Sequence, residues 1–362
     1  MLKRVKYVKK ITKNNSFILQ SFNKNIVLLF RYNMFSMINK QRISIILLIF
    51  ISLLGMSQDP EFSQVSPGLI RLNPAFAGTG GRGRVSGIYR NQWPGLSSAY
   101  ITTGAFYDQP VEFVHGGVGV QIINDSQGGN TFRWSSAALI YSYHLQAGRD
   151  IYIFTGFQAS INQWSRSVNN LIFPDMIDPM EGLINPTMEV IAGNNKLYPD
   201  FSVGFLANYK DMIAGISINH LAKPDISLSD SYKSQLSRKW SFFIRNTFRF
   251  SGSTADGFFI SPGIFFRSQQ KSKILKYGFT VGYDCIQLGT WISHDLDITM
   301  NLLTFGLAME ISGLGIAYSY DFAPWRTDLP VPVTGAHEFS LSIYLSGNKK
   351  NQNIKAINFP KF

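Results

Sequence analysis

The chain has few charged residues and almost no cysteine. Of its 362 residues, 15% are Asp, Glu, Lys or Arg, and only Cys285 is a cysteine. Because an ordinary soluble domain carries about 25% charged residues, much of this surface is expected to face something other than water. A lone cysteine excludes an intramolecular disulfide and any cysteine-based metal cluster. It also stands far from the export cut site described below, which excludes a lipid anchor there.

The sequence has no apolar run long enough for a permanent transmembrane helix, which needs about 18 residues or more. The one extended run, Ile43 to Leu54, follows Lys40 and Arg42 and precedes small residues at 55 and 57. This three-part pattern is typical of a secretory signal peptide cleaved after Ser57. The sequence therefore predicts export, with Met37 (or Met34) as the true start and residues 1–36 as an extended leader. A retained signal anchor is the alternative.

The positive charge lies at the two ends of the chain. The formal net charge is +12, but residues 1–57 hold ten Lys or Arg and residues 348–362 hold four, with no acid in either stretch. The remaining body has 20 basic against 22 acidic residues. A nucleic-acid binder places its charge on the folded surface, so no nucleic-acid partner is predicted.

What is abundant after residue 58 is alternation with a period of two. In residues 336–345, His337, Phe339 and Leu341 share one face, while Glu338 and Ser340 share the other. Strands of about 9 to 13 residues with one apolar face are typical of tilted membrane crossings. The pattern predicts an all-β fold, a transmembrane antiparallel β-barrel of outer-membrane type with about fourteen strands. The expected strands are 84–92, 99–109, 115–125, 131–144, 150–163, 199–209, 212–221, 238–250, 257–268, 273–285, 288–296, 300–310, 313–323 and 336–346.

The loop lengths support an even strand count. The three long connections, 164–198, 222–237 and 324–335, all follow odd-numbered strands, so all are expected at one edge of the barrel. In bacterial barrels the longer loops face outward. The alternative is a soluble periplasmic β-sandwich or propeller, but no repeat of 40 to 50 residues indicates a propeller.

Motifs that carry chemistry are weak. Residues 78–83 satisfy G-x-G-x-x-G, but Asn73-Pro74 precedes them and a strand-like segment follows, whereas a dinucleotide site needs a strand before and a helix after. These glycines are expected to form a turn into the first strand. The five histidines show no metal-binding spacing, and no nucleophile motif is present. The sequence predicts no cofactor, no metal and no catalytic site; an outer-membrane hydrolase is the low-ranked alternative.

Two of the long loops have distinct character. Loop 164–198 carries many apolar residues, which indicates either that it folds into the barrel or that it meets a partner. Loop 324–335 contains three prolines and is expected to be stiff.

Six motifs, in order, resemble one known family. They are QDPEFSQ, LNPAFAGT, YRNQWPG, GGVGVQIINDSQG, YSYDF and GAHEFSLSIYL. Together they are similar to the PorP/SprF family of type IX secretion outer-membrane proteins of the Bacteroidetes, over about Gln58 to Leu345. The long leader before Met37 and the basic tail after the last strand depart from the family pattern.

The resemblance implies a non-enzymatic barrel in the outer membrane. It would assist secretion or surface attachment of a protein with a type IX C-terminal signal domain, a large adhesin in gliding species, and some relatives associate with the periplasmic ring of the machine. An outer-membrane transport barrel for a hydrophobic or small solute is the alternative. The implied organisation is a leader (1–36), a signal peptide (37–57), an N-terminal periplasmic segment (58–83), a barrel (84–346) and a basic tail (347–362).

Carried onto this chain, the family motifs mark candidate partner-binding residues, most of them at one rim. Apart from the pair at the chain's entry into the barrel, all are expected at the outer end of their strands. Arg90, Asp125, Asp321 and Glu338 could instead form ion pairs that close the barrel mouth, with Asp321 and Glu338 facing the lumen. The candidates are Asn73, Pro74, Arg90, Asn91, Gln92, Trp93, Asn124, Asp125, Tyr320, Asp321, His337 and Glu338.

Overall fold

The computed structural model describes residues 59–96, 98–167, 171–178, 180–184, 186–188, 195–228, 233–250, 257–296, 301–323, 335–345, 357 and 359–361. The chain divides into two compact units, Met1–Gln58 and Asp59–Phe362, and only the second contains described residues. The predicted leader, signal peptide and cut site, and most of loop 324–335, therefore lie outside the described residues.

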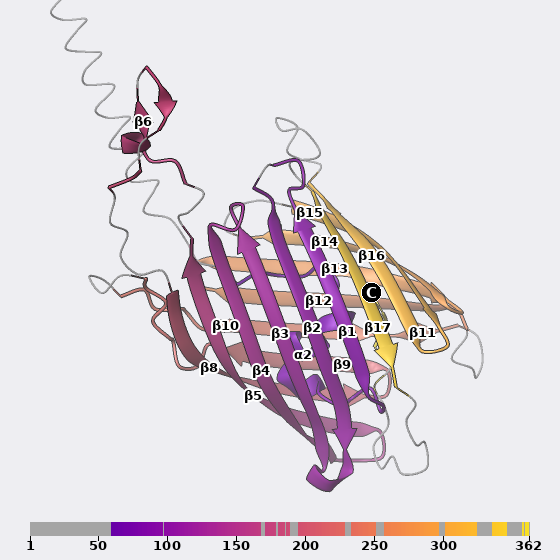
Figure 1. Cartoon of the computed structure of the whole chain (residues 1–362). Helices are drawn as coiled ribbons and strands as arrows, with labels where there is room; N and C mark the ends of the chain where they lie inside the picture. The colour runs from indigo at the N-terminus through magenta and orange to yellow at the C-terminus, as the bar shows by residue number, and fades with distance from the viewer. Residues whose placement is uncertain are drawn as a thin grey trace, which may run out of the picture. The chain divides into compact units, whose positions relative to one another are not determined.

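The second unit is a closed antiparallel β-barrel (Figure 1). The sheet closes because the first strand, β1, pairs with the last, β17, and β10 pairs with β12. A two-residue strand, β11, continues β10 along the same neighbour, so the wall has the predicted fourteen strands. They are β1 (Arg84–Gln92), β2 (Tyr100–Val111), β3 (Gly116–Gln127), β4 (Phe132–Gln146), β5 (Ile151–Arg166), β8 (Asn195–Tyr209), β9 (Met212–Asn219), β10 (Lys239–Asn246) with β11 (Phe248–Arg249), β12 (Phe259–Gln269), β13 (Ser272–Tyr283), β14 (Ile286–Asp295), β15 (Asn301–Ile311), β16 (Leu314–Phe322) and β17 (Ala336–Tyr344).

The connections differ in length between the two edges of the barrel. The three long ones, between β5 and β8, β9 and β10, and β16 and β17, share one edge, as the parity of the count predicts. We call this the long-loop edge and the other the short-turn edge. At the short-turn edge most connections have two to four residues, and the exception is residues 250–258.

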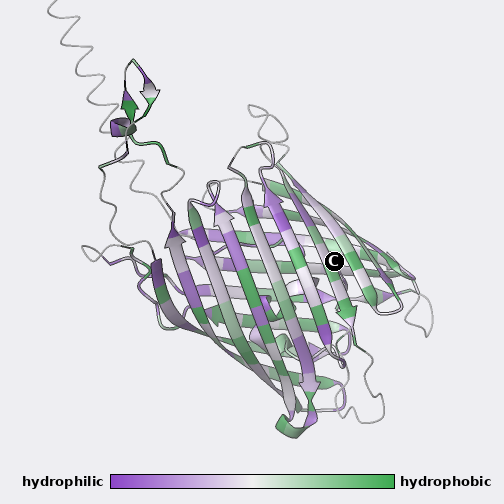
Figure 2. Ribbon diagram, viewed as in Figure 1, coloured by the Kyte–Doolittle hydropathy of each residue, from purple (hydrophilic) through white to green (hydrophobic). Residues whose placement is uncertain are grey.

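Side chains alternate between the lumen and the outer face of the wall. On β17, Glu338 is 0% exposed and Ser340 8%, whereas Phe339 is 53% exposed and Leu341 46%. Figure 2 shows hydrophobic and hydrophilic residues interleaved along the strands in the same way. An apolar outer face with a polar inner one is the pattern of a membrane barrel. No helix among the described residues is long and apolar enough to cross a bilayer.

The lumen holds residues 59–83, which we call the luminal segment. It contains three short helices, η1 (Ser66–Gly68), α2 (Leu69–Leu72) and η2 (Pro74–Phe76). Phe76 is fully buried and stacks on Phe243 of β10 with ring centroids 5.5 Å apart. Barrels of about eight strands are filled by their own side chains, whereas wider ones enclose a channel or a plug. In this barrel the hydrophobic core is built between the wall and the luminal segment.

Candidate functional site: the luminal segment and its anchors

The luminal segment makes hydrogen bonds to strands all around the wall. Its partners include Glu338 on β17, Lys276 on β13, Ser217 on β9, Ser142 on β4 and Asp108 on β2. Residues 58–83, expected from the sequence as a periplasmic segment, are thus found from 59 onward inside the barrel. Because its partners are spread over the whole circumference, the segment occupies the lumen rather than one side of it.

The first anchor is a buried ion cluster near the long-loop edge. Arg90 lies between two acids, with Nη2 2.7 Å from Asp321 Oδ2 and Nη1 3.0 Å from Glu338 Oε2. No side chain of the three is more than 9% exposed. This is the arrangement expected from the sequence for these residues, with both acids facing the lumen.

The same cluster holds the chain of the luminal segment. Glu338 accepts hydrogen bonds from the backbone N–H of Ser63 (2.8 Å) and of Gln64 (2.6 Å). The Ser63 hydroxyl donates to Asp321 at 2.6 Å. Two carboxylates beside one guanidinium carry surplus negative charge in a buried place, and the nearby Lys276 and the backbone N–H groups that donate to Glu338 offset it. The cluster therefore closes the barrel and binds the luminal segment at the same time.

A second anchor holds the start of the segment at the same edge. The carboxylate of Asp59 lies 3.0 Å from His220 Nε2 and also pairs with Lys239 Nζ, while His220 Nδ1 lies 2.7 Å from Asp200 Oδ2. Burial alone would raise the pKa of Asp59, but His220 and Lys239 hold that pKa well below its usual range. Burial would lower the pKa of His220, but the Asp59 charge and hydrogen bonds to both acids raise it to about 9. The imidazole is therefore charged at neutral pH and bridges two carboxylates.

The third contact is a close fit in the middle of the barrel, at Asn73 and Pro74. The Asn73 amide donates to the carbonyls of Phe205 (3.1 Å) and Ile216 (2.9 Å), and its Oδ1 accepts from Ala75 N (2.9 Å). The wall here is glycine. A Cβ at Gly156 would lie 2.2 Å from Ala75 N, and one at Gly204 would lie 1.9 Å from Asn73 Oδ1.

The G-x-G-x-x-G stretch is a turn, as the sequence predicts. Gly78 and Gly81 have φ of 74° and 71°, values that favour glycine. Strand β1 begins at Arg84 directly after it, and Gly78 N donates to Asp108 on β2. No helix N-terminus follows to hold a pyrophosphate.

Two further candidates, Asp125 and Trp93, take no part in the buried ion cluster, and Asp125 nevertheless faces the lumen. Asp125 is buried there but accepts from Thr102 Oγ1 (2.6 Å) and Gln127 Nε2 (2.7 Å), so the ion pair considered for it does not form in the structure. Trp93 directly follows β1, has φ of 59° and packs on Tyr100.

Of the other candidates, Asn91, Asn124, Tyr320 and His337 lie toward the outer face of the wall. His337 packs against Tyr320 with ring centroids 4.9 Å apart and pairs across the ladder with Asn91. Asn124 Oδ1 accepts from the Ser135 hydroxyl. Aromatic residues at a strand end on the outer face are typical of an interfacial girdle. Gln92 is half-buried and closes the β1 ladder opposite Ala336.

Residues near the C-terminus contact the lumen from the short-turn edge. Phe359 is 5% exposed and packs on Phe76 at 5.7 Å, with the Arg245 guanidinium 4.8 Å from its ring centroid. Lys361 Nζ lies 2.8 Å from Glu310 Oε2. From the sequence, residues 347–362 are expected only as a basic tail, and the apolar Ile357 and Phe359, two positions apart, are the signal that could have indicated burial.

The described residues 171–188 of loop 164–198 are exposed or half-buried, and the two ends of the 164–198 range belong to β5 and β8. The loop contains a small hairpin of β6 (Ile177–Asp178) and β7 (Gly182–Leu183). Met180 is 94% exposed and Met188 85%. Of the two expectations for this loop, folding into the barrel is not what the described residues show.

These features define a class of protein, an outer-membrane-type β-barrel whose lumen holds its own N-terminal segment. A model of the type IX secretion system membrane protein PorP/SprF matches residues 55–343. The chain belongs to the PorP/SprF family and is a type IX secretion outer-membrane barrel. This family is a membrane component of the secretion system and not a family of enzymes.

Solved structures with a similar fold are porins and channels of low identity. The Pseudomonas putida toluene transporter TodX is 9% identical, covering 80% of this chain and 98% of its own, with a TM-score of 0.43. KdgM porin is 6% identical, covering 73% and 99%, with a TM-score of 0.33. A mutant of the Rh. blastica porin is 5% identical, covering 73% and 99%, with a TM-score of 0.32. No curated protein matches the chain significantly.

Proposed function

We propose that this protein is a non-enzymatic scaffold of the type IX secretion system. It assists the secretion or surface attachment of a protein that carries a type IX C-terminal signal domain, and it does so with its lumen filled. The observation that carries the proposal is the luminal segment itself, bound at Arg90, Asp321 and Glu338 near one edge and fitted against wall glycines in the middle. A lumen occupied in this way is that of a plugged barrel rather than of an open diffusion channel.

The partner would bind at the long-loop edge, which we take as the outer one because long loops face outward in bacterial barrels. The exposed apolar residues of loop 164–198 support this choice. Met180 and Met188 stand almost fully in solvent, and methionine side chains adapt to varied partner surfaces. In gliding species the secreted partner would be a large adhesin. Ring components of the machine would approach from the periplasmic side.

Transport of a hydrophobic or small solute is the second candidate, and one observation favours it. A cavity of 170 Å³ remains between the luminal segment and the wall near the long-loop edge. It ends against buried side chains, so transport would need the luminal segment to move.

The test is mass spectrometry of proteins that co-purify with the tagged protein after gentle extraction of outer membranes. The proposal predicts recovery of a secreted protein's C-terminal domain, or of ring components. A Met180→Ser/Met188→Ser double variant is expected to lose the secreted protein. The control is Phe113→Ser, which changes a residue 91% exposed at the short-turn edge. Recovery of the barrel alone, with bound lipid or solute, would contradict the proposal and favour transport.

A further inference from the structure

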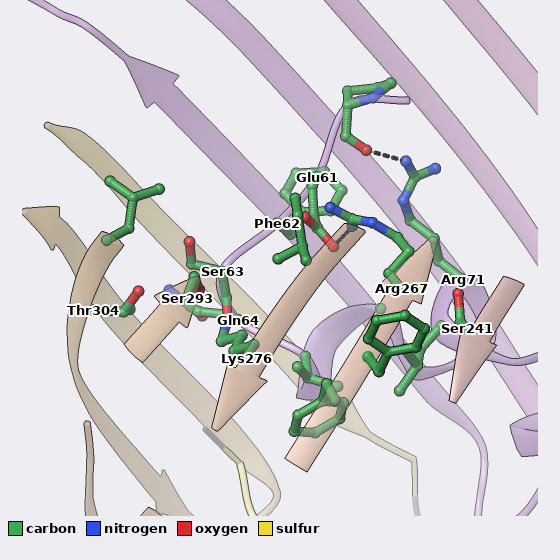
Figure 3. Close-up of a pocket in the computed structure, with 18 of the residues that line it drawn as sticks. Glu61, Phe62, Ser63, Gln64, Arg71, Ser241, Arg267, Lys276, Ser293 and Thr304 are labelled. Atoms are coloured by element: carbon green, nitrogen blue, oxygen red, sulfur yellow. Dashed lines mark hydrogen bonds and ion pairs between the residues drawn. The ribbon is translucent and has the colours of Figure 1, made fainter. Parts of the chain in front are cut away.

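The cavity near the long-loop edge has the chemistry of a binding site for an anion. It lies between residues 60–72 of the luminal segment and the ends of β10, β12, β13, β14 and β15, and Figure 3 shows its lining. Glu61 lines it with a side chain that is 52% exposed. The cavity therefore reaches solvent at Glu61.

Cations outnumber acids among the residues that line the cavity. Two of the five cations are already neutralised, Arg90 by Asp321 and Glu338, and Lys239 by Asp59. The other three face the cavity with weaker partners. Arg71 donates to the carbonyl of Pro60, Lys276 donates to the carbonyl of Ser63 at 2.6 Å, and Arg267 pairs with Glu61.

One acid that stabilises these cations lines the cavity, because Lys276 lies near Asp321 and Glu338, and Asp321 is a lining residue. The acids near the other two cations do not line it. Asp59 and Asp125 stabilise the charge of Arg71, and Asp295 stabilises that of Arg267, but none of these three carboxylates lines the cavity. Glu61 is thus the one lining carboxylate that is not held by Arg90. Figure 3 shows Glu61 and Arg267 side by side at the cavity, with Lys276 and Arg71 around it.

The uncharged lining is partly apolar and partly polar, the polar residues being Ser63, Gln64, Ser241, Ser293 and Thr304. Phe62, Val65, Leu72 and Phe265 contribute hydrophobic side chains, and all of them belong to or pack on the hydrophobic core. A dry apolar cavity of about 150 Å³ is enough to hold a benzene ring. The lining therefore suits a small apolar group that carries one negative charge.

We propose that this cavity binds a carboxylate attached to a small apolar body, with Arg267, Arg71 and Lys276 as the cationic partners. Glu61 occupies the carboxylate position when no ligand is bound. Because the Glu61 side chain is half exposed, its ion pair with Arg267 contributes little, and an entering carboxylate displaces it readily. The ligand is either a free organic acid or the C-terminal carboxylate of a polypeptide that ends in an apolar residue. This inference stands independently of the proposed secretion partner.

The experiment is calorimetric titration of the detergent-folded protein with benzoate, and with benzamide as the neutral isostere. Benzoate is expected to bind and benzamide to bind at least about tenfold more weakly, because charge-assisted hydrogen bonds are lost. Arg267→Gln is expected to weaken the binding of benzoate by a similar factor. Glu61→Gln is expected to strengthen it a few-fold, because the competing carboxylate is gone.

Arg249→Gln is the matched control, since it removes an arginine from an exposed ion pair at the short-turn edge. Its benzoate affinity is expected to equal that of the wild type, and the heat-modifiable gel mobility of folded barrels checks that each variant is assembled. N-acetylphenylalanine and its amide then distinguish the sources. Tighter binding of the acid than of benzoate identifies a chain terminus, and binding of benzoate alone identifies a free acid. Equal binding of benzoate and benzamide, or an unchanged affinity in Arg267→Gln, would overturn the proposal.

Discussion

Replacing Gly156 by alanine should displace the luminal segment from its position against the barrel wall. The added Cβ would lie 2.2 Å from Ala75 N and 2.3 Å from Pro74 C. Ordinary carbon contacts are about 3.5–4.0 Å. Since both contacted atoms belong to the backbone, no side-chain rotation relieves the clash, and residues 74 and 75 must move by more than an ångström.

That displacement costs the contacts that hold Asn73. Its three side-chain hydrogen bonds, to Phe205 O, Ile216 O and Ala75 N, depend on the present position of the chain. A buried hydrogen bond contributes about 1 kcal/mol, and a buried amide left unpaired costs about 1–3 kcal/mol. We therefore expect a loss of about 3–5 kcal/mol in the binding of the luminal segment to the wall. This corresponds to about a hundred- to a few-thousandfold increase in the population with the segment released.

The assay is thiol labelling at a cysteine placed in the segment. The labelled variant is Ser66→Cys in a Cys285→Ser background, because Ser66 is only 5% exposed. A membrane-impermeant maleimide reacts with this cysteine only when the segment leaves the lumen, so the labelling rate reports how often that happens. The rate is normalised to that of the unfolded protein. The control is Gly87→Ala, where the new Cβ meets only Gly104 O at 3.9 Å. Equal labelling rates in Gly156→Ala, Gly87→Ala and the wild type would refute the fit of segment to wall.

The same labelling assay tests three further interactions. Arg90→Met leaves two buried carboxylates without their cation and should cost about 3–5 kcal/mol, whereas Arg249→Met breaks an exposed pair worth at most about 1 kcal/mol; comparable rates in the two variants would contradict the first anchor. The pKa of His220, about 9 in the folded protein, lies above the unfolded value of about 6.5. The stability that His220 contributes to the folded state is therefore complete below about pH 6.5 and disappears as the pH rises through about 9. The normalised labelling rate should rise over that window, and His220→Gln should remove the rise; a flat profile in the wild type would contradict the second anchor. Phe359→Ala removes a buried ring, which costs about 3–5 kcal/mol. Because that ring packs on the luminal segment near the short-turn edge, its loss should raise the labelling rate at Ser66→Cys. An unchanged rate would show that this contact does not hold the segment.

The barrel was predictable from sequence because its signals are local. Alternation along β17 predicts which residues face lipid, and the bounds predicted for strand one, 84–92, are those of β1. The strands next to loop 164–198 run further than expected, to Arg166 on β5 and from Asn195 on β8. In these extensions polar residues such as Gln163 stand where the alternation would place apolar ones. The alternation pattern therefore ends before the hydrogen bonding between the strands does.

The filling of the lumen was not predictable in the same way. Residues 59–83 have no periodicity, and the carboxylates that bind Ser63 and Gln64 lie more than 250 residues away in the chain. The lumen-facing charges Lys239, Arg245 and Lys276, in otherwise apolar strands, were the available signal, because a buried charge requires a partner. Arg90, Asp321 and Glu338 could be grouped because all three sit at strand ends of one edge. No comparable rule places Asp59 beside His220.

Ion flux through proteoliposomes that contain the folded wild-type protein tests the central claim most directly. If residues 59–83 fill the lumen, the wild type should pass small ions no faster than protein-free liposomes, and Gly156→Ala should pass them measurably faster. The amount of folded barrel in each preparation is equalised by its heat-modifiable gel band. Steady flux through the wild type at the level of an open porin would contradict the claim that the barrel is filled by its own chain.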